Sequence, residues 1–132
     1  MSLHGLAAHQ AVFNTLTSAL APVAVYDIAP EDAAMPFVDI SAQQMLPITA
    51  GTPYTGQFAE HHLYLTVWSN YRGQAEVLGI LNQIHAALHN QTFSLDGTGR
   101  AVICQVQSAD SRLDADGLSH QGAVTLRLLV AN

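Results

Sequence analysis

The chain is poor in residues on which several classes of function depend. It has four Arg, no Lys and a single cysteine, Cys104, among 132 residues, with a net charge of −6. Proteins that grip nucleic acids neutralise phosphates with clustered Lys and Arg, so this balance argues against that class. One cysteine excludes an intramolecular disulfide, and its position in an apolar run indicates a small core residue.

Targeting and membrane signals are also missing from the sequence. The first residues lack a basic region followed by a long apolar segment, so no signal peptide is predicted. No apolar run approaches the roughly 18 residues of a membrane span. We therefore expect a soluble protein that is made inside the cell and has no membrane partner.

Charged residues are scarce overall, at 11% of the chain against roughly 25% in an average protein. Hydrophobic residues make up 49%. A shortage of charge indicates that part of the surface contacts other protein. The alternative is a surface filled by Ser, Thr, Gln, Asn and His. The length predicts one domain, over residues 1–132.

A strand, a turn and a helix follow one another in the middle of the chain. Side chains alternate between the two faces of a strand, so Leu63, Leu65 and Val67 share one face. Tyr64 and Trp68 share the other, where they either form a contact surface or lie under helices as core. The helix opens at Gly73, and its apolar stripe consists of Val77, Leu81, Ile84 and Leu88.

The remaining pattern places this unit in an α+β fold. A helix is predicted over residues Leu3–Leu20, with Leu6, Phe13, Leu16 and Leu20 near one face, and Gln43–Gly56 is predicted to be a long loop. The predicted strands cover Val23–Ile28, Phe37–Ile40, Gln57–Ser69, Ala101–Ser108 and His120–Val130. We expect a mainly antiparallel sheet of about four to five strands with two helices packed on one face.

Candidate metal and catalytic patterns are each incomplete. His85 and His89 have chelating helical spacing, but the sequence offers no HExxH glutamate between them. His61 and His62 are strand neighbours and point to opposite faces, and Asp114–Gly117 resembles a turn more than a calcium loop. We expect no metal, no cofactor and no enzyme activity. The alternative is a small metal-binding enzyme or adaptor domain that uses His85 and His89.

The ordered set of motifs resembles the phage tail completion family, the tail terminators or head–tail joining proteins of long-tailed phages and phage-like gene-transfer particles. After an Ala/Leu-rich first helix, the motifs that carry the resemblance are Val25-Tyr26-Asp27 with Pro30, Pro36-Phe37-Val38, His62–Ser69, Arg72–Glu76, Ile84–His89 and Asp114–Gly122. They cover nearly the whole chain in the right order. The absence of Lys is a departure that the family does not forbid.

The resemblance implies a structural virion protein without catalytic residues. Such a protein forms a ring, expected to be hexameric, at the head-proximal end of the tail tube. It stops tail growth and joins the tail to the head, and DNA passes through the lumen without sequence-specific binding. Its implied partners are copies of itself, the tail-tube protein and a head-connector protein.

Interface residues are predicted from the same strand patterns. A head-to-tail ring uses two different patches on each subunit, and we expect these at the Gln43–Gly56 loop and at the sheet edges. Tyr64 and Trp68 are candidate contact anchors, because aromatic side chains often dominate interfaces. Thr125 and Arg127, on the non-core face of the last strand, complete this surface, together with Tyr54 from the loop.

Overall fold

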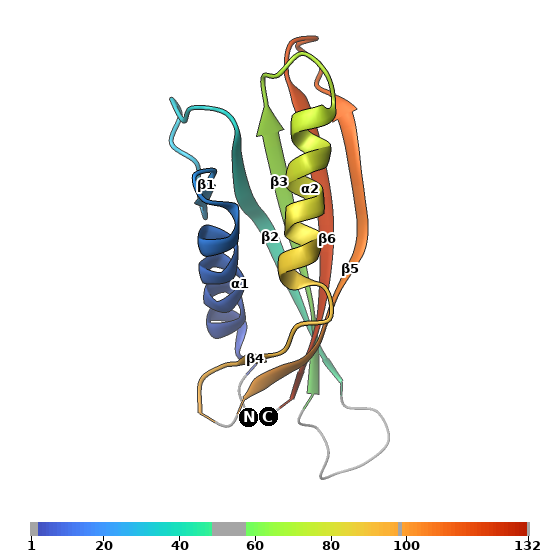
Figure 1. The fold of residues 1–132 in the computed structure, drawn as a ribbon. Helices are drawn as coiled ribbons and strands as arrows, with labels where there is room; N and C mark the ends of the chain where they lie inside the picture. Colours follow the sequence, from blue (N-terminus) through green and yellow to red (C-terminus); the bar gives the residue numbers. More distant parts are fainter. Residues whose placement is uncertain (1–2, 49–57, 98, 132) are drawn as a thin grey trace.

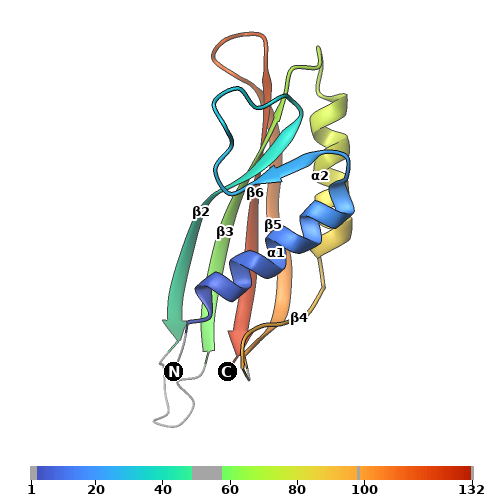
Figure 2. The ribbon, with the colours of Figure 1, turned by 90° about the vertical axis from the view of Figure 1, so that its left-hand side faces the viewer.

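The structure is a computed structural model that describes residues 3–48, 58–97 and 99–131. In chain order the elements are α1 (Gly5–Leu20), β1 (Ala24–Tyr26), β2 (Phe37–Ile48), β3 (Phe58–Ser69), α2 (Ala75–Leu88), β4 (Phe93–Ser94), β5 (Arg100–Leu113) and β6 (His120–Ala131). Both helices lie on the same face of one long, curved sheet (Figure 1, Figure 2). No helix in the described part of the chain is long and apolar enough to cross a membrane.

In the described residues the sheet is mixed and has six strands, in the order β1-β2-β3-β6-β5-β4. The α+β class was predicted correctly, and the sheet is mainly antiparallel as expected, but it has six strands where four to five were predicted, and one pair is parallel. β1 pairs with β2 in parallel, because the connection over residues 27–36 returns the chain to the same end of the sheet. β4 has only two residues and gives no alternating pattern to detect.

The core lies between the two helices and the sheet. The predicted stripe of α2 is confirmed, because Val77, Leu81, Ile84 and Leu88 are all buried. In α1 the buried residues are Ala8, Val12, Leu16 and Leu20, which recur every four positions. The predicted place of Leu6 on this face was wrong: its side chain is 72% exposed, because ten residues of helix rotate it away from Leu16.

The prediction of a loop over Gln43–Gly56 was wrong in its first part. Gln43–Ile48 continues β2 and pairs with β3 down to Ile48 opposite Phe58. Pro47 misled the sequence interpretation. Proline is tolerated here because this part of β2 lies at the edge of the sheet, where a missing N–H leaves the ladder intact. Residues 49–56, which include Tyr54, lie outside the described residues.

The second long hairpin also extends further than predicted. β5 continues through the polar segment Asp110–Leu113, which pairs with β6 up to Leu113 opposite His120. The turn at Asp114–Gly117 is confirmed, and Gly117 adopts the left-handed conformation with φ 72°. The Asp116 carboxylate accepts hydrogen bonds from the N–H groups of Leu118 and Ser119, which lower the pKa of Asp116.

A buried histidine attaches the start of α1 to β3. His61 is fully buried, and its Nε2 donates to the Leu3 carbonyl at 2.9 Å. Its Nδ1 faces the Gln43 amide nitrogen at 3.4 Å, and the same nitrogen donates to the Gly5 carbonyl at 3.1 Å. Burial lowers the pKa of His61 and the nearby His4 adds to this, while the bond to Leu3 opposes it. His61 is therefore a satisfied, neutral core residue.

This environment predicts acid sensitivity of the fold. Below the usual histidine pKa of about 6.5, the unfolded chain binds a proton that the folded chain resists. Stability should therefore fall as pH decreases from about 6.5 towards the lower folded pKa of His61. The variant His61→Gln should be less stable at pH 7.5 by roughly 1–3 kcal/mol. Its urea-unfolding free energy should change less between pH 7.5 and pH 5 than that of the wild type. Equal changes in both proteins would contradict the assignment.

Candidate functional site

The face of the sheet opposite the helices is the candidate site, and we call it the open face. Along β3, Leu63, Leu65 and Val67 are at most 1% exposed beneath the helices, whereas the alternate residues are not covered in the same way. Tyr64 is 37% exposed and Trp68 is partly exposed. The alternative in which helices cover these two aromatics is therefore wrong, because both helices pack on the other face (Figure 2).

The strand register brings four of the five predicted interface residues onto this face. Tyr64 is directly opposite Thr125, and Arg127 is opposite His62, two positions along the same pair of strands. Trp68 lies two positions beyond Thr66 on the same face of β3. Tyr54 belongs to the segment that the structure does not describe. The shared face follows from the two-residue period of strands, which sequence alone reveals.

A charged cluster that the sequence interpretation missed lies on the open face, on the paired strands β3 and β6. The Arg127 Nε donates to a carboxylate oxygen of Glu60, and the His62 Nε2 lies 3.3 Å from the other oxygen. All three side chains are only 18–26% exposed. The hydrogen bond from Arg127 is the main cause that lowers the pKa of Glu60, followed by that from His62. Glu60 and His62 lie four and two positions before Tyr64 on the same strand. The alternation of the strand would therefore have placed them on the same face as Tyr64.

The open face changes in character along its strands. Around Tyr64 it is polar: the Ser41 hydroxyl donates to the Tyr64 carbonyl at 2.9 Å and lies 3.1 Å from the Thr66 hydroxyl, with Trp68 beyond them towards the β5–β6 turn. Asp39 lies in the same region, and burial raises its pKa. At the opposite end, large apolar side chains are 37–41% exposed, namely Leu46, Ile48, Phe58 and Ile103. Such a mixture of apolar, aromatic and paired charged groups suits contact with protein.

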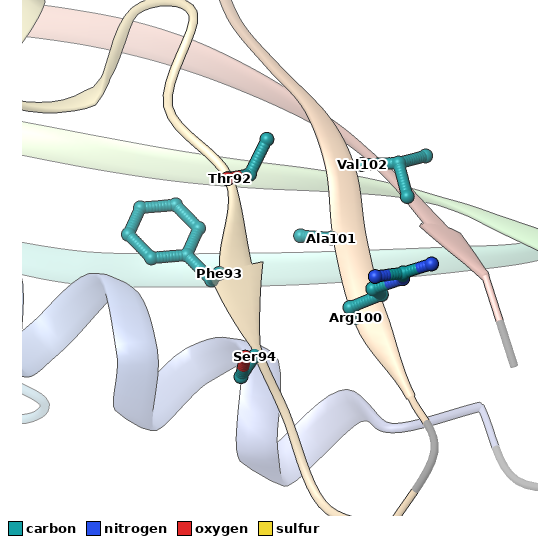
Figure 3. A pocket seen from close by; sticks show the side chains of 6 residues that line it. All are labelled: Thr92, Phe93, Ser94, Arg100, Ala101 and Val102. Carbon is teal, nitrogen blue, oxygen red and sulfur yellow. The ribbon is translucent and has the colours of Figure 1, made fainter.

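Enclosed space for a small ligand is limited in the described part of the molecule. One open hollow, of about 230 Å³, lies between β4 and the start of β5, and Figure 3 shows the side chains that line it. It is lined by Thr92, Phe93, Ser94, Arg100, Ala101 and Val102. Phe93 packs against the core and Arg100 is exposed, so their functional groups do not converge.

The histidine pair on α2 has a geometry that does not suit chelation. The rings of His85 and His89 are stacked, with centroids 4.4 Å apart and planes 18° apart. A metal binds in the plane of an imidazole, so stacked rings do not direct their lone pairs at one ion. His89 Nδ1 instead accepts the Val106 N–H at 3.2 Å. Among the described residues, no group of three or more His, Cys, Asp or Glu could hold a metal ion.

Cys104 is placed as an inert core residue. It is fully buried on the helix-covered face, and burial raises the pKa of its thiol to about 12. The nucleophilic form of cysteine is the thiolate, which is negligible at neutral pH with such a pKa. This agrees with the sequence-based interpretation of Cys104 as a small apolar residue.

A family comparison decides the identity of this fold. The model of the family described as tail completion protein gp17 matches residues 4–131. The chain belongs to this family. Tail completion proteins are structural virion proteins and not a known class of enzyme. No significant match was found among curated proteins.

Solved structures agree with the tail completion fold. A chain in the virion of a native gene transfer agent particle is similar, with a TM-score of 0.72, 16% identity and 92% coverage of both chains. The gp17 protein of bacteriophage SPP1 is similar with a TM-score of 0.64 and 21% identity, covering 96% of this chain and 91% of that one. At these identities, the two structures support the fold.

Proposed function

We propose that this tail completion protein forms a ring at the head-proximal end of a phage or phage-like tail. The ring, expected to be a hexamer, ends growth of the tail tube and joins the tail to the head. The observation that carries this function is the family match over residues 4–131. The similar chain in a gene transfer agent virion supports a place in such a particle, and we propose the neck of a particle assembled in the bacterial cytoplasm.

The surface of the molecule fits a subunit with many protein neighbours. Only 11% of residues are charged, and large apolar side chains remain exposed at one end of the open face. A ring subunit contacts two neighbouring copies, the tail tube below and a head connector above. Tyr64, Trp68, Thr125 and Arg127 share the open face, which supplies a broad surface for these contacts or for the lumen.

Passage of DNA is compatible with the charge of the chain. The net charge is −6, and the Arg127 guanidinium is occupied by Glu60. An acidic lining repels phosphates and does not trap them, so DNA can slide past it. The competing metal-binding function of His85 and His89 is disfavoured by their stacked rings.

Electron microscopy of particles from a strain lacking the gene tests this function. We expect filled heads beside separate tails, some of them abnormally long, because tail growth is no longer stopped. Supplying the wild-type gene in trans should restore joined particles with uniform tails. Joined particles of normal tail length in the deletion strain would contradict the proposed role and would favour the adaptor alternative.

A further inference from the structure

The two edges of the sheet are each covered over only part of their length, and at opposite ends. β1 pairs with β2 only at Phe37–Asp39, which leaves Ile40–Ile48 without an outer strand in the described structure. On the other edge, β4 pairs with the start of β5 at Arg100–Ala101. The segment Gln107–Leu113 then has no outer strand among the described residues.

Covering of the β5 edge continues a little beyond β4. The Asn90 N–H donates to the Cys104 carbonyl at 2.8 Å, and the Val106 N–H donates to His89 Nδ1 at 3.2 Å. The residues that follow α2 thus satisfy the backbone groups of Cys104 and Val106, which are no longer free to pair with an added strand. Only the half of β5 near the β5–β6 turn remains open.

The uncovered part of β2, Ile40–Ile48, lacks the usual protection of an edge strand. Soluble proteins place charged residues on exposed edges to prevent pairing with another chain. Ile40–Ile48 contains no charged residue, and it exposes Met45, Leu46 and Ile48 by 37–41%. Leu6 of α1, 72% exposed, lies with Met45 around an open hollow beside this edge. A long apolar edge of this kind is a template for strand addition.

Strand direction identifies an occupant for this edge. The pairs β2–β3, β3–β6 and β6–β5 are all antiparallel, so β2 and β5 run in opposite directions. A second copy, rotated about an axis roughly along the strands, brings its β5 antiparallel to β2 of the first copy. We infer that Ile40–Ile48 of one subunit pairs with Gln107–Leu113 of the next, a head-to-tail contact that can close into a ring. This contact rests on the proposed ring function.

The offset between the two free segments matches the geometry of a closed barrel. Asp110, at the centre of the β5 segment, is level with Ala123, Thr66 and Asp39 across the sheet. If Asp110 of one subunit pairs with Gln44, the centre of the β2 segment, in the next, the two subunits are shifted along the strands by the distance from Asp39 to Gln44. With the bulge between these residues, that distance is about 13–16 Å. Four strands span about 19 Å, so the strands tilt by about 35–40°. Closed barrels have tilts of about 35–45°.

Cross-linking in assembled tails tests the contact. Tails would be purified from cells in which the only copy of the protein carries Gln44→Cys and Asp110→Cys, and treated with a short bis-maleimide. Both positions are exposed, whereas the native Cys104 is fully buried and does not react. Within one subunit, two strands separate β2 from β5, which places the two thiols more than about 14 Å apart. We expect a ladder of covalent dimers, trimers and larger multimers up to the complete ring.

Matched variants make each outcome decisive. Either cysteine alone, or Gln44→Cys with Leu118→Cys in the exposed β5–β6 turn, should give no ladder. Completed tails that contain the double variant but yield no ladder would overturn the edge contact and leave the proposed ring function standing. Dimers from Gln44→Cys alone would also overturn it, because they indicate two β2 edges related by a two-fold axis. Normal joined particles in the deletion strain would instead overturn the ring function.

A charge variant covers the case in which the double variant is not incorporated. Leu46→Glu places a charge on the free edge of β2, at a side chain that is 41% exposed. We expect it to fold, as judged by circular dichroism, but to be absent from tails. Leu118→Glu, away from both edges, should be incorporated normally. Incorporation of the folded Leu46→Glu protein at the wild-type level would contradict pairing at this edge.

Discussion

Leu126→Ala should lower the free energy of unfolding by about 2–5 kcal/mol, the largest effect expected for a single truncation in this chain. Leu126 is fully buried in the middle of β6, between Leu63 on one side and Val106 on the other. Neighbouring strands hold the backbone on both sides, so the site cannot collapse around the missing atoms. The loss therefore combines the transfer free energy of the removed atoms with the cost of the cavity.

Urea unfolding followed by circular dichroism measures this effect. A native domain is stable by only about 5–15 kcal/mol, so the melting temperature should fall by roughly 6–20 °C. Leu118→Ala is the matched control, because Leu118 is 76% exposed in the β5–β6 turn. It should change stability by less than about 0.5 kcal/mol. A similar small change for Leu126→Ala would show that the centre of β6 is not part of a tightly packed core.

Gly122→Ala should destabilise the protein by about 1–3 kcal/mol, because it separates α2 from the sheet. A Cβ atom at Gly122 would lie 2.7 Å from the Cγ1 of Val77 and 3.3 Å from the Cβ of Val67. Neither neighbour can move easily, since β-branched side chains have few rotamers. The missing side chain of Gly122 is thus what allows the first turn of α2 to approach β6 closely.

A second glycine gives a control with the opposite sign. Gly79 lies inside α2, and a Cβ there would meet no atom within 4 Å. Gly79→Ala should stabilise the protein by about 0.5–1 kcal/mol, because glycine loses more backbone entropy in a helix than alanine. Thermal unfolding of both variants distinguishes the steric effect at Gly122 from the effect of helix propensity at Gly79. Destabilisation by both substitutions, or by neither, would contradict this account of the helix–sheet contact.

Long periodic segments of the sequence were sufficient to predict their own structure. The alternation around Leu63 and Leu65 and the stripe of α2 were correct, because each buried face repeats with the period of its element. The same alternation placed Tyr64 and Trp68 on one face. Pattern failed for β4 and for Gln43–Ile48. β4 is too short to show a period. Pro47 indicated a loop, but it lies in β2 at the edge of the sheet, where a proline is tolerated.

The sequence by itself determined the class of the protein, since local periodicity and ordered motifs reflect constraints that act within each element. Only the tertiary structure decided how distant residues meet. Glu60 and Arg127 are 67 positions apart in the sequence, and the strand register brings them together in the charged cluster of the open face. The strand order left part of each edge without an outer strand in the described structure. Register and edge exposure depend on contacts between strands, so no pattern within a single strand encodes them.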